Sequence, residues 1–438
     1  MTNMFRWALP VTALLSACIA AAQEDSLTLQ ECLRRAQENN LQLQQSREGI
    51  NAAAAKLREA EAPLYPSVSA SGSYSHMFPV STFSFSMGPF SPPVSMRFGL
   101  ENAYNASLGL QYMLFDWGRK GAGVDLGTLG KAAAEVGAEL SELQVENAVV
   151  QVFYGILVTE RAVVVLERSI ASLEQRLTAT RQRYNNGLVS RFDVLSLDVS
   201  LSAARTRRLD ALSQLNRMRI AINRLLGLPL DRAVALRGEL AYEPQSMRID
   251  SLLVIARRTR PELLMAQTQE EMARKQIALA STFDKPTVSL SAGAGLRNGF
   301  FPNPDVLRGN WNAGMTVAFP IFDGFRTSAL VQQAETALRT AELRTRDLGP
   351  AVELEIRQAL IDLATNQERM ALEQMRTGQA EEALRIAAER HAGGLISTLE
   401  LIDAEVGLQN ARLGHLQALG NCIQSRYALD KAIGRHPQ

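Results

Sequence analysis

The chain has 438 residues, of which 46% are hydrophobic and 21% are charged, and its formal net charge is +1. This composition excludes intrinsic disorder, and the balanced charge leaves no basic patch that would bind nucleic acid. Three cysteines are too few for a disulfide scaffold, four scattered histidines lack metal-ligand spacing, and no phosphate-binding glycine loop or nucleophile elbow occurs, so we expect no metal site, no cofactor and no enzyme.

The first 22 residues have the pattern of an export signal, with one charge at Arg6 and a short apolar run after it. Two ways of processing are open. The small residues Ala20–Ala22 form an ordinary cleavage site, whereas Leu15–Cys18 resembles a bacterial lipobox and would leave Cys18 lipidated. We favour the ordinary site because apolar residues follow the cysteine. In both cases the mature protein is expected to leave the cytoplasm.

The remaining chain repeats one series of elements in two structural repeats, residues 23–245 and 246–438. In the first we expect a helix over 27–62, strands near 67–76 and 103–114, a long helix over 118–185 and a returning helix over 189–226. In the second we expect a helix over 249–281, strands near 287–297 and 310–320, a long helix over 325–392 and a returning helix over 396–433. Each long helix would span ~100 Å, and the heptad spacing of the returning helices indicates coiled-coil packing.

The four expected strands alternate small polar with apolar residues. Serine occupies every second position from Ser67 to Ser75, and tyrosine or tryptophan occurs among the apolar positions. This alternation is typical of outer-membrane barrel strands, although a soluble half-buried sheet alternates as well. Four strands cannot close a membrane barrel, so several protomers would have to share one.

An internal repeat carries the organisation of the chain. The segment Arg183–Gly227 aligns with Arg390–Gly434 at a constant offset of 207 residues, with no gap and fourteen identities. Each copy begins with a glycine turn, at Gly187 and at Gly394, that opens a returning helix. The offset is 220 before the hairpins and 207 after them, so the first hairpin carries 220 − 207 = 13 extra residues, within 77–102.

This layout resembles the TolC-type outer membrane efflux proteins from about Leu27 to Gly434. Its most specific pieces are the sequences RYNNGLVSRFDVL and RHAGGLISTLELIDAE. The resemblance implies a mainly α protein with a pair of β-hairpins. It implies a homotrimer whose protomers share one 12-stranded outer-membrane β-barrel, which a long α-helical coiled-coil barrel continues through the periplasm of a Gram-negative bacterium.

The function that the resemblance implies is a passive exit duct for small molecules, surrounded by outer-membrane lipid. A periplasmic adaptor protein and an inner-membrane pump would be its partners. A duct for type I protein secretion or for metal-ion efflux would have the same layout. The alternative class is a periplasmic coiled-coil scaffold without a pore.

The resemblance also implies a gate at the tip of the helices. The acids that follow the second glycine turn in the family fall on Glu400 and Asp403, which threefold symmetry would arrange as rings of carboxylates in the pore. The alternative is that both are solvated acids on an exposed helix face.

Contacts between the two glycine turns close the tip in the family, and they would involve His391, Asp193 and Phe192. The family has a tyrosine at the position of His391 and an arginine at the position of Ile396. His391 retains the capacity to pair with Asp193, but Ile396 cannot make an ionic contact. We therefore expect the closed tip to be held differently here, or more weakly.

Cys32 and Cys422 remain after processing. The resemblance places both near the level where the first and last helices meet. A disulfide between them is one interpretation, and two buried thiols are the other.

Overall fold

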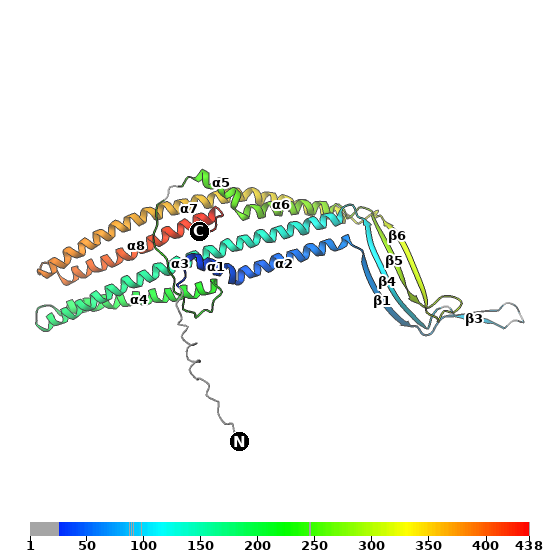
Figure 1. The fold of residues 1–438 in the computed structure, drawn as a ribbon, viewed down its shortest axis with the longest axis horizontal. Helices are drawn as coiled ribbons and strands as arrows, with labels where there is room; N and C mark the ends of the chain where they lie inside the picture. The colour runs from blue at the N-terminus through cyan, green and yellow to red at the C-terminus, as the bar shows by residue number, and fades with distance from the viewer. Residues whose placement is uncertain are drawn as a thin grey trace, which may run out of the picture. The chain divides into compact units, whose positions relative to one another are not determined.

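The computed structural model describes residues 26–86, 88, 90, 92–97, 99–244 and 247–437. The export signal expected over residues 1–22, and with it the lipidation of Cys18, lies outside these residues. The described part is mainly helical, with strands gathered in two places (Figure 1).

The helices of the first half are α1 (Leu29–Asn39), α2 (Leu41–Glu61), α3 (Arg119–Asn185) and α4 (Arg191–Leu225). Those of the second half are α5 (Ile249–Thr259), α6 (Pro261–Ala280), α7 (Arg326–Ala392) and α8 (Thr398–Ala432). The strands are β1 (Ser67–His76), β2 (Thr82–Phe85), β3 (Val94–Arg97), β4 (Asn102–Phe115), β5 (Thr287–Arg297) and β6 (Arg308–Ala318).

Each half has two helices where one was expected before its hairpin. The chain breaks at Asn40, whose side-chain oxygen accepts hydrogen bonds from the backbone of Gln42 and Leu43 and so caps α2. It breaks again at Arg260, because Pro261 starts α6 and forces the residue before it into an extended conformation. The two breaks lie 220 residues apart and therefore occupy equivalent positions.

The described residues form two compact units that do not follow the two halves of the sequence. The helical unit takes the segments up to Ser46, Glu139–Pro261 and from Gly349 onward. The hairpin unit takes Arg47–Ala138 and Glu262–Leu348. Both units therefore contain parts of both halves.

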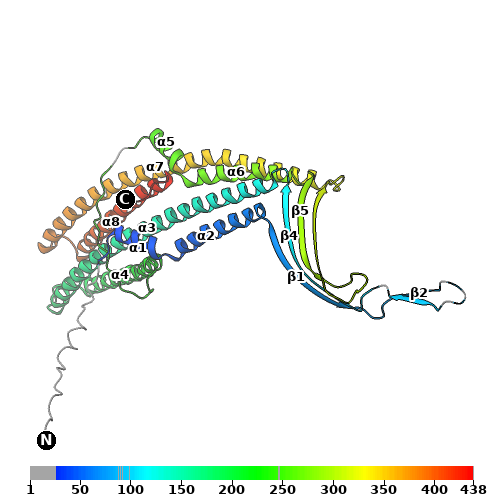
Figure 2. The ribbon, with the colours of Figure 1, turned by 45° about the vertical axis from the view of Figure 1, so that its right-hand side comes forward.

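The hairpin unit is built around an antiparallel sheet with the strand order β1-β4-β5-β6 (Figure 2). Its register places apolar residues in continuous rows across all four strands, as in the row Val68, Leu110, Ala292 and Ala313. The opposite face carries rows of small polar residues, such as Ser69, Gly109, Gly293 and Asn312. Strands β1 and β6 are the edges, and the described residues provide no further partner for either.

The extra residues of the first hairpin form a second, smaller sheet of β2 and β3, which extends beyond the end of the four-stranded sheet (Figure 2). Phe83 lies opposite Met96, and Phe85 lies opposite Val94, so one face of this sheet is apolar. Phe83, Val94 and Met96 are exposed, which leaves this apolar face uncovered.

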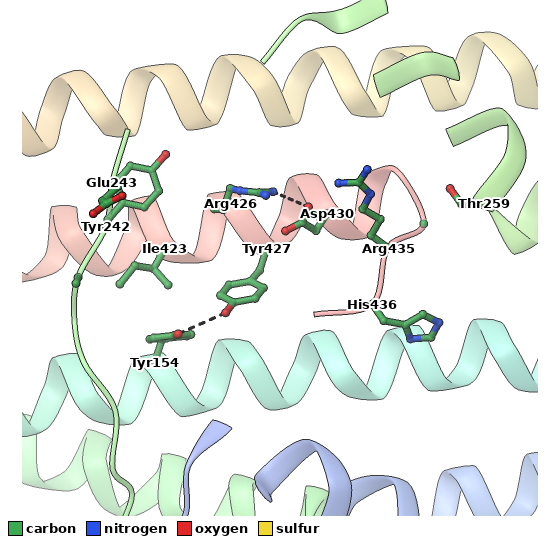
Figure 3. Close-up of a pocket in the computed structure, with 12 residues that line it drawn as sticks. Tyr154, Tyr242, Glu243, Thr259, Ile423, Arg426, Tyr427, Asp430, Arg435 and His436 are labelled. Carbon is green, nitrogen blue, oxygen red and sulfur yellow. Dashed lines mark hydrogen bonds and ion pairs between the residues drawn. The ribbon is translucent and has the colours of Figure 1, made fainter. Parts of the chain in front are cut away.

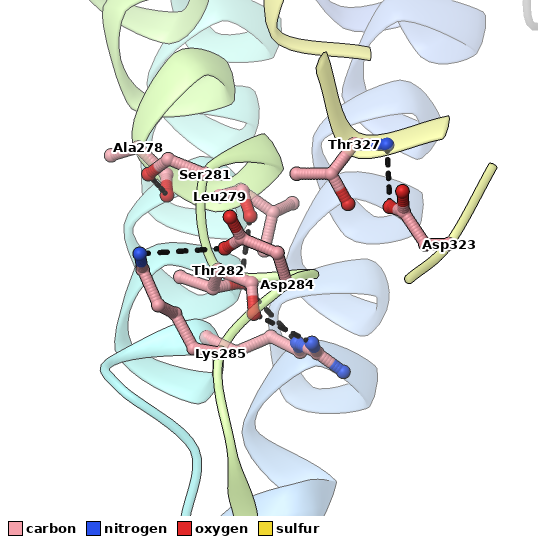
Figure 4. A network of polar contacts seen from close by, with 9 residues as sticks. Ala278, Leu279, Ser281, Thr282, Asp284, Lys285, Asp323 and Thr327 are labelled. Carbon is pink, nitrogen blue, oxygen red and sulfur yellow. Dashed lines mark hydrogen bonds and ion pairs between the residues drawn. The ribbon is translucent and has the colours of Figure 1, made fainter. Parts of the chain in front are cut away.

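A polar junction joins the strands to the helices of the hairpin unit (Figure 4). Arg119 of α3 donates hydrogen bonds to the hydroxyl and the carbonyl oxygen of Thr282, and its guanidinium lies 4.6 Å from the centre of the Phe283 ring. Asp323 accepts a hydrogen bond of 2.8 Å from the backbone of Thr327 and so holds the first turn of α7.

The turns after β4 and β6 each place an aromatic residue in the left-handed backbone region. Trp117 has φ 53° and Phe325 has φ 67°, although an adjacent glycine also has positive φ in each turn. Such a conformation is strained for a bulky residue. Both rings contact an aromatic neighbour edge to face, Phe115 and Phe322 respectively.

The core of the helical unit forms where α1, α3 and α4 meet. Phe153 and Ile156 of α3 pack there with Ile222 of α4 and with Cys32 of α1. Among the described residues, α3 alone is long and apolar enough to cross a bilayer by length and composition. Its most apolar stretch supplies this core, which explains its composition without a membrane.

The structure contradicts the interpretation that Cys32 and Cys422 form a disulfide. Cys32 and Cys422 are both free and buried. Burial raises the pKa of the Cys32 thiol to about 12 and also raises that of Cys422. Both are therefore neutral, unreactive thiols, in agreement with the second interpretation.

Candidate functional site

Two tight turns connect the long helices to the returning helices. The backbone N–H of Leu188 donates to the carbonyl of Arg183, and Leu395 donates to Arg390 in the same way, each at 2.9 Å. The N–H groups of Gly187 and Gly394 donate to the carbonyls three residues before them, those of Tyr184 and His391. Together these bonds form the Schellman arrangement that ends a helix. It requires the left-handed φ of 75° at Gly187 and 71° at Gly394. A side chain at either glycine would meet no atom within 4 Å, so the requirement is one of conformation alone.

The returning helices begin with matching capping boxes. Ser190 and Asp193 cap α4, and Ser397 and Glu400 cap α8. In the second box one carboxylate oxygen of Glu400 accepts hydrogen bonds from the backbone and the hydroxyl of Ser397, at 2.8 and 2.9 Å. These bonds hold the pKa of Glu400 below its usual value. Glu400 therefore has a local structural role in addition to any role in a pore.

The two acids expected to line a pore are both exposed. Glu400 and Asp403 lie one turn apart at the start of α8. No hydrogen bond or ion pair to Asp403 occurs within the described parts of the chain. The single chain thus brings these carboxylates to a free surface, on which the copies in an oligomer could meet.

The expected contact between His391 and Asp193 passes through a third residue, Thr398. The Nε2 atom of His391 lies 3.4 Å from the hydroxyl oxygen of Thr398, which is itself buried. The pKa of Asp193 is lowered chiefly by hydrogen bonds with Ser190 and also by one with Thr398. Thr398 is therefore a tip residue that the sequence did not single out.

Histidine at this position is held uncharged. Burial lowers the pKa of His391, and the nearby Arg183 and Arg176 lower it further. A neutral ring has no ionic attraction for Asp193 at neutral pH. Phe192, the third residue expected in the tip contacts, is 65% exposed and lies free on the surface.

The two helical hairpins of the helical unit contact each other through α8. Glu405 of α8 is buried, and its carboxylate lies 3.0 Å from the Nε atom of Arg176 on α3. These two atoms are not aligned for a hydrogen bond, so the contact is an ion pair alone. Ser169 of α3 donates a 2.7 Å hydrogen bond to Gln409 of α8.

An apolar cluster lies beside this polar contact. Leu173 and Leu177 of α3 and Leu197 and Leu201 of α4 pack there against Ile402 of α8. The tip ends of the two hairpins therefore share one small core, which fixes where the acids at the start of α8 can lie.

Each hairpin is also tied together by an equivalent ion pair. Arg205 contacts Glu174 at 2.7 Å in the first, and Arg412 contacts Glu381 at 2.7 Å in the second. Both pairs obey the offset of 207 residues. Because these side chains are about half exposed, each pair contributes about 1 kcal/mol or less.

A second pair of glycines ends the returning helices, and here space is short. A Cβ atom at Gly227 would lie 2.5 Å from the carbonyl oxygen of Asn39, and one at Gly434 would lie 2.7 Å from that of Thr259. Both glycines also have positive φ. These positions are therefore restricted twice, by conformation and by the close approach of another helix end.

One pocket of the helical unit lies between α3, α8 and the chain that follows α4 (Figure 3). Its volume is about 840 Å³. Tyr154 and Tyr427 meet across it with their hydroxyl oxygens 3.4 Å apart, and Arg426 pairs with Asp430 at 2.5 Å. No group of three or more potential metal ligands occurs among the described residues.

Comparison with known proteins identifies the family. The family model described as outer membrane efflux protein matches residues 32–228 and 252–435. The chain belongs to this family. The protein is therefore an outer-membrane protein that extends into the periplasm, and the expected resemblance is confirmed.

Relatives of this efflux protein are distant in sequence. Outer membrane protein TolC of Escherichia coli (strain K12) is 21% identical over 264 residues, which are 58% of this chain and 54% of TolC. Nodulation protein T of Rhizobium leguminosarum bv. trifolii is 24% identical over 260 residues, which are 58% of this chain and 55% of that protein. The matched region spans about half the length of these curated relatives.

The fold is shared with solved outer-membrane channels. The crystal structure of the Campylobacter jejuni CmeC outer membrane channel superposes with a TM-score of 0.80 at 19% identity, covering 93% of this chain and 85% of CmeC. The expectation of a mainly helical outer-membrane protein with paired strands is thus confirmed at the level of the fold.

Proposed function

We propose that this efflux protein is a passive exit duct, one of three identical protomers that together expel small molecules across the periplasm and the outer membrane. The observation that carries the proposal is the four-stranded sheet of an outer-membrane protein, with one apolar face, one polar face and two open edges. Open edges are not tolerated in lipid, so β6 of one protomer pairs with β1 of the next. Three protomers close a barrel of twelve strands, which surrounds water with its polar face.

Exposed apolar stripes on the helices support the same assembly. Leu195, Leu209 and Ile220 follow one face of α4, and each is at least half exposed. Leu354, Ile361 and Leu372 follow one face of α7 and are also more than half exposed. Spacings of 7, 11 and 14 residues keep each set on a single helix face. In the trimer these stripes are buried between neighbouring protomers.

The tip supplies the gate of the proposed duct. Three copies of Glu400 and Asp403 place six carboxylates around the pore axis, where they attract cations. The turns at Gly187 and Gly394 shape the tip, and the chain of His391, Thr398 and Asp193 links the two turns of each protomer. Opening therefore requires the contacts of Thr398 with the neutral ring of His391 and with the carboxylate of Asp193 to separate, without an ion pair between His391 and Asp193.

Partners and cargo follow from the proposed role. A duct without an energy source depends on an inner-membrane pump, and a periplasmic adaptor would join the two. The protein is proposed to act as a channel and not as an enzyme. Small molecules are the favoured cargo; a secreted protein or a metal ion would be the cargo in the alternatives. A periplasmic scaffold without a pore is disfavoured because it would not need the continuous apolar face of the sheet.

We expect the protein extracted in detergent to be a trimer that forms ion channels in planar lipid bilayers. The reason is that the edges β1 and β6 are satisfied only by neighbouring copies. Light scattering of the purified protein and single-channel recording test the two parts of this expectation. A monodisperse monomer that keeps its β-signal in circular dichroism would contradict the proposal. Extraction of the protein from cells without detergent would contradict it as well.

A second expectation concerns residues 77–102, the region that contains the 13 extra residues of the first hairpin. Long barrel loops face the outside of the cell, so chymotrypsin added to whole cells should cut after Phe83 or Phe90. The loop of the second hairpin should resist, because buried Asn298 bonds the backbone of Tyr104 and Asn102. Mass spectrometry of the fragments locates the cuts. Cleavage that begins only after the outer membrane is permeabilised would show that the topology is reversed.

A further inference from the structure

Two arginines lie side by side on the polar face of the sheet. Arg297 ends β5, Arg308 begins β6, and the two are directly opposite in the register. Their row continues through Asn105 of β4 to Ser73 of β1. Both side chains are exposed. They share the face of the serine, glycine and asparagine rows, and not the apolar face that would contact lipid.

This arrangement opposes the usual rule for strand pairs. Like charges directly opposite each other destabilise a sheet, and an acid is the usual partner on the neighbouring strand. Neither arginine forms an ion pair with a carboxylate anywhere in the described segments of the chain. On β1, β4 and β5, every other residue that points to this polar face is uncharged. A local conflict of this kind in a native protein is typical of a functional position.

Arg297 is also held in place. The guanidinium of Arg297 lies 4.9 Å from the centre of the Phe300 ring, a cation–π contact. The next residue, Asn298, is buried, donates to the carbonyl of Asn102 at 2.7 Å and accepts from the N–H of Tyr104 at 2.9 Å. The end of β5 is therefore clamped to β4, which limits fraying of the strand at Arg297.

We propose that Arg297 and Arg308 form an anion-binding ring in the lumen of the barrel. The inference rests on the proposed trimer, in which three pairs place six guanidinium groups on the water-filled side. Guanidinium groups bind phosphate-like and carboxylate oxyanions through paired hydrogen bonds, so multivalent oxyanions are the class of ligand that the ring selects. The ring raises the local concentration of anions and acts on selectivity in the direction opposite to the acids at the tip.

The test uses the full-length trimer in planar bilayers. Arg297→Gln combined with Arg308→Gln should shift the ratio of Cl− to K+ permeability about threefold or more toward K+. Inorganic tripolyphosphate, added to one chamber and then to the other, should block wild-type channels from at least one side. Its half-blocking concentration should rise about tenfold in the double variant. Each single variant should have part of both effects.

Arg97→Gln is the matched control for each single variant, because it removes one positive charge per protomer, as they do, but lies on β3, outside the four-stranded sheet. It should leave permeability and block at wild-type values. If the double variant conducts but keeps wild-type selectivity and block, or if Arg97→Gln has equal effects, the anion ring is wrong while the duct stands. If wild-type trimers do not conduct, the duct and the ring fall together.

Discussion

Replacing Glu400 by glutamine together with Asp403 by asparagine should abolish most of the cation selectivity of the duct and most of its block by multivalent cations from the periplasmic side. The double variant removes six carboxylates from the proposed trimer. Two unit charges ~8 Å apart at an effective dielectric of ~40 interact by about 1 kcal/mol, and several such interactions act on each passing ion. The ratio of K+ to Cl− permeability in planar bilayers is therefore expected to fall about tenfold.

These substitutions preserve the start of α8. Glutamine at the third helical position can still close a capping box with Ser397. Because the hydrogen bonds with Ser397 lower the pKa of Glu400, its charge persists in mild acid, and it is lost only as the pH falls through that lowered pKa. In the proposed trimer the six carboxylates repel one another, which acts in the opposite direction and should raise some of their pKa values.

Asp198→Asn is the matched control for the gate. Asp198 is an exposed acid of α4 that lies 3.6 Å from Arg181 of α3. Its replacement removes one carboxylate per protomer, against two in the double variant, and keeps the shape of the side chain. Selectivity that changes equally in the control and in the double variant would mean that Glu400 and Asp403 are ordinary surface acids.

Gly227→Ala should destabilise the helical unit far more than Gly187→Ala. Both glycines have a left-handed conformation, which costs about 1–2 kcal/mol for alanine. At Gly227 the new Cβ atom would also lie 2.5 Å from the carbonyl oxygen of Asn39, and overpacking of this kind costs about 1–3 kcal/mol more. At Gly187 nothing lies within 4 Å. We expect a total of about 2–5 kcal/mol against about 1–2 kcal/mol.

Thermal unfolding followed by circular dichroism at one scan rate measures this difference as a lower Tm. Gly434→Ala provides an internal repeat of the experiment, because its Cβ atom would approach the carbonyl oxygen of Thr259 to 2.7 Å. We expect the highest Tm for the wild type, a lower Tm for Gly187→Ala, and the lowest Tm for Gly227→Ala and Gly434→Ala. Equal values for Gly187→Ala and Gly227→Ala would show that the close backbone approach is not rigid.

The local elements of this protein can be predicted from its amino-acid sequence. Gly187 and Gly394 predict the tip turns, because a residue with left-handed backbone conformation is needed where each long helix ends. The structure adds a capping box at the start of each returning helix, formed by Ser190 with Asp193 and by Ser397 with Glu400. The alternation of small polar with apolar residues predicts the four strands of the two hairpins. Such signals are readable because each depends on the conformation of only a few consecutive residues.

Matched positions of the two repeats differ in burial and in their partners because their tertiary contacts differ. Asp198 and Glu405 are matched by the repeat, yet Asp198 is an exposed acid paired within its hairpin, whereas Glu405 is buried against Arg176 of the other hairpin. Thr398 enters the tip contact because the helix ends meet there in space. Cys32 and Cys422 stay apart as free thiols. These outcomes depend on which helix faces pack together, and contacts between residues distant in sequence leave no periodic pattern in the chain.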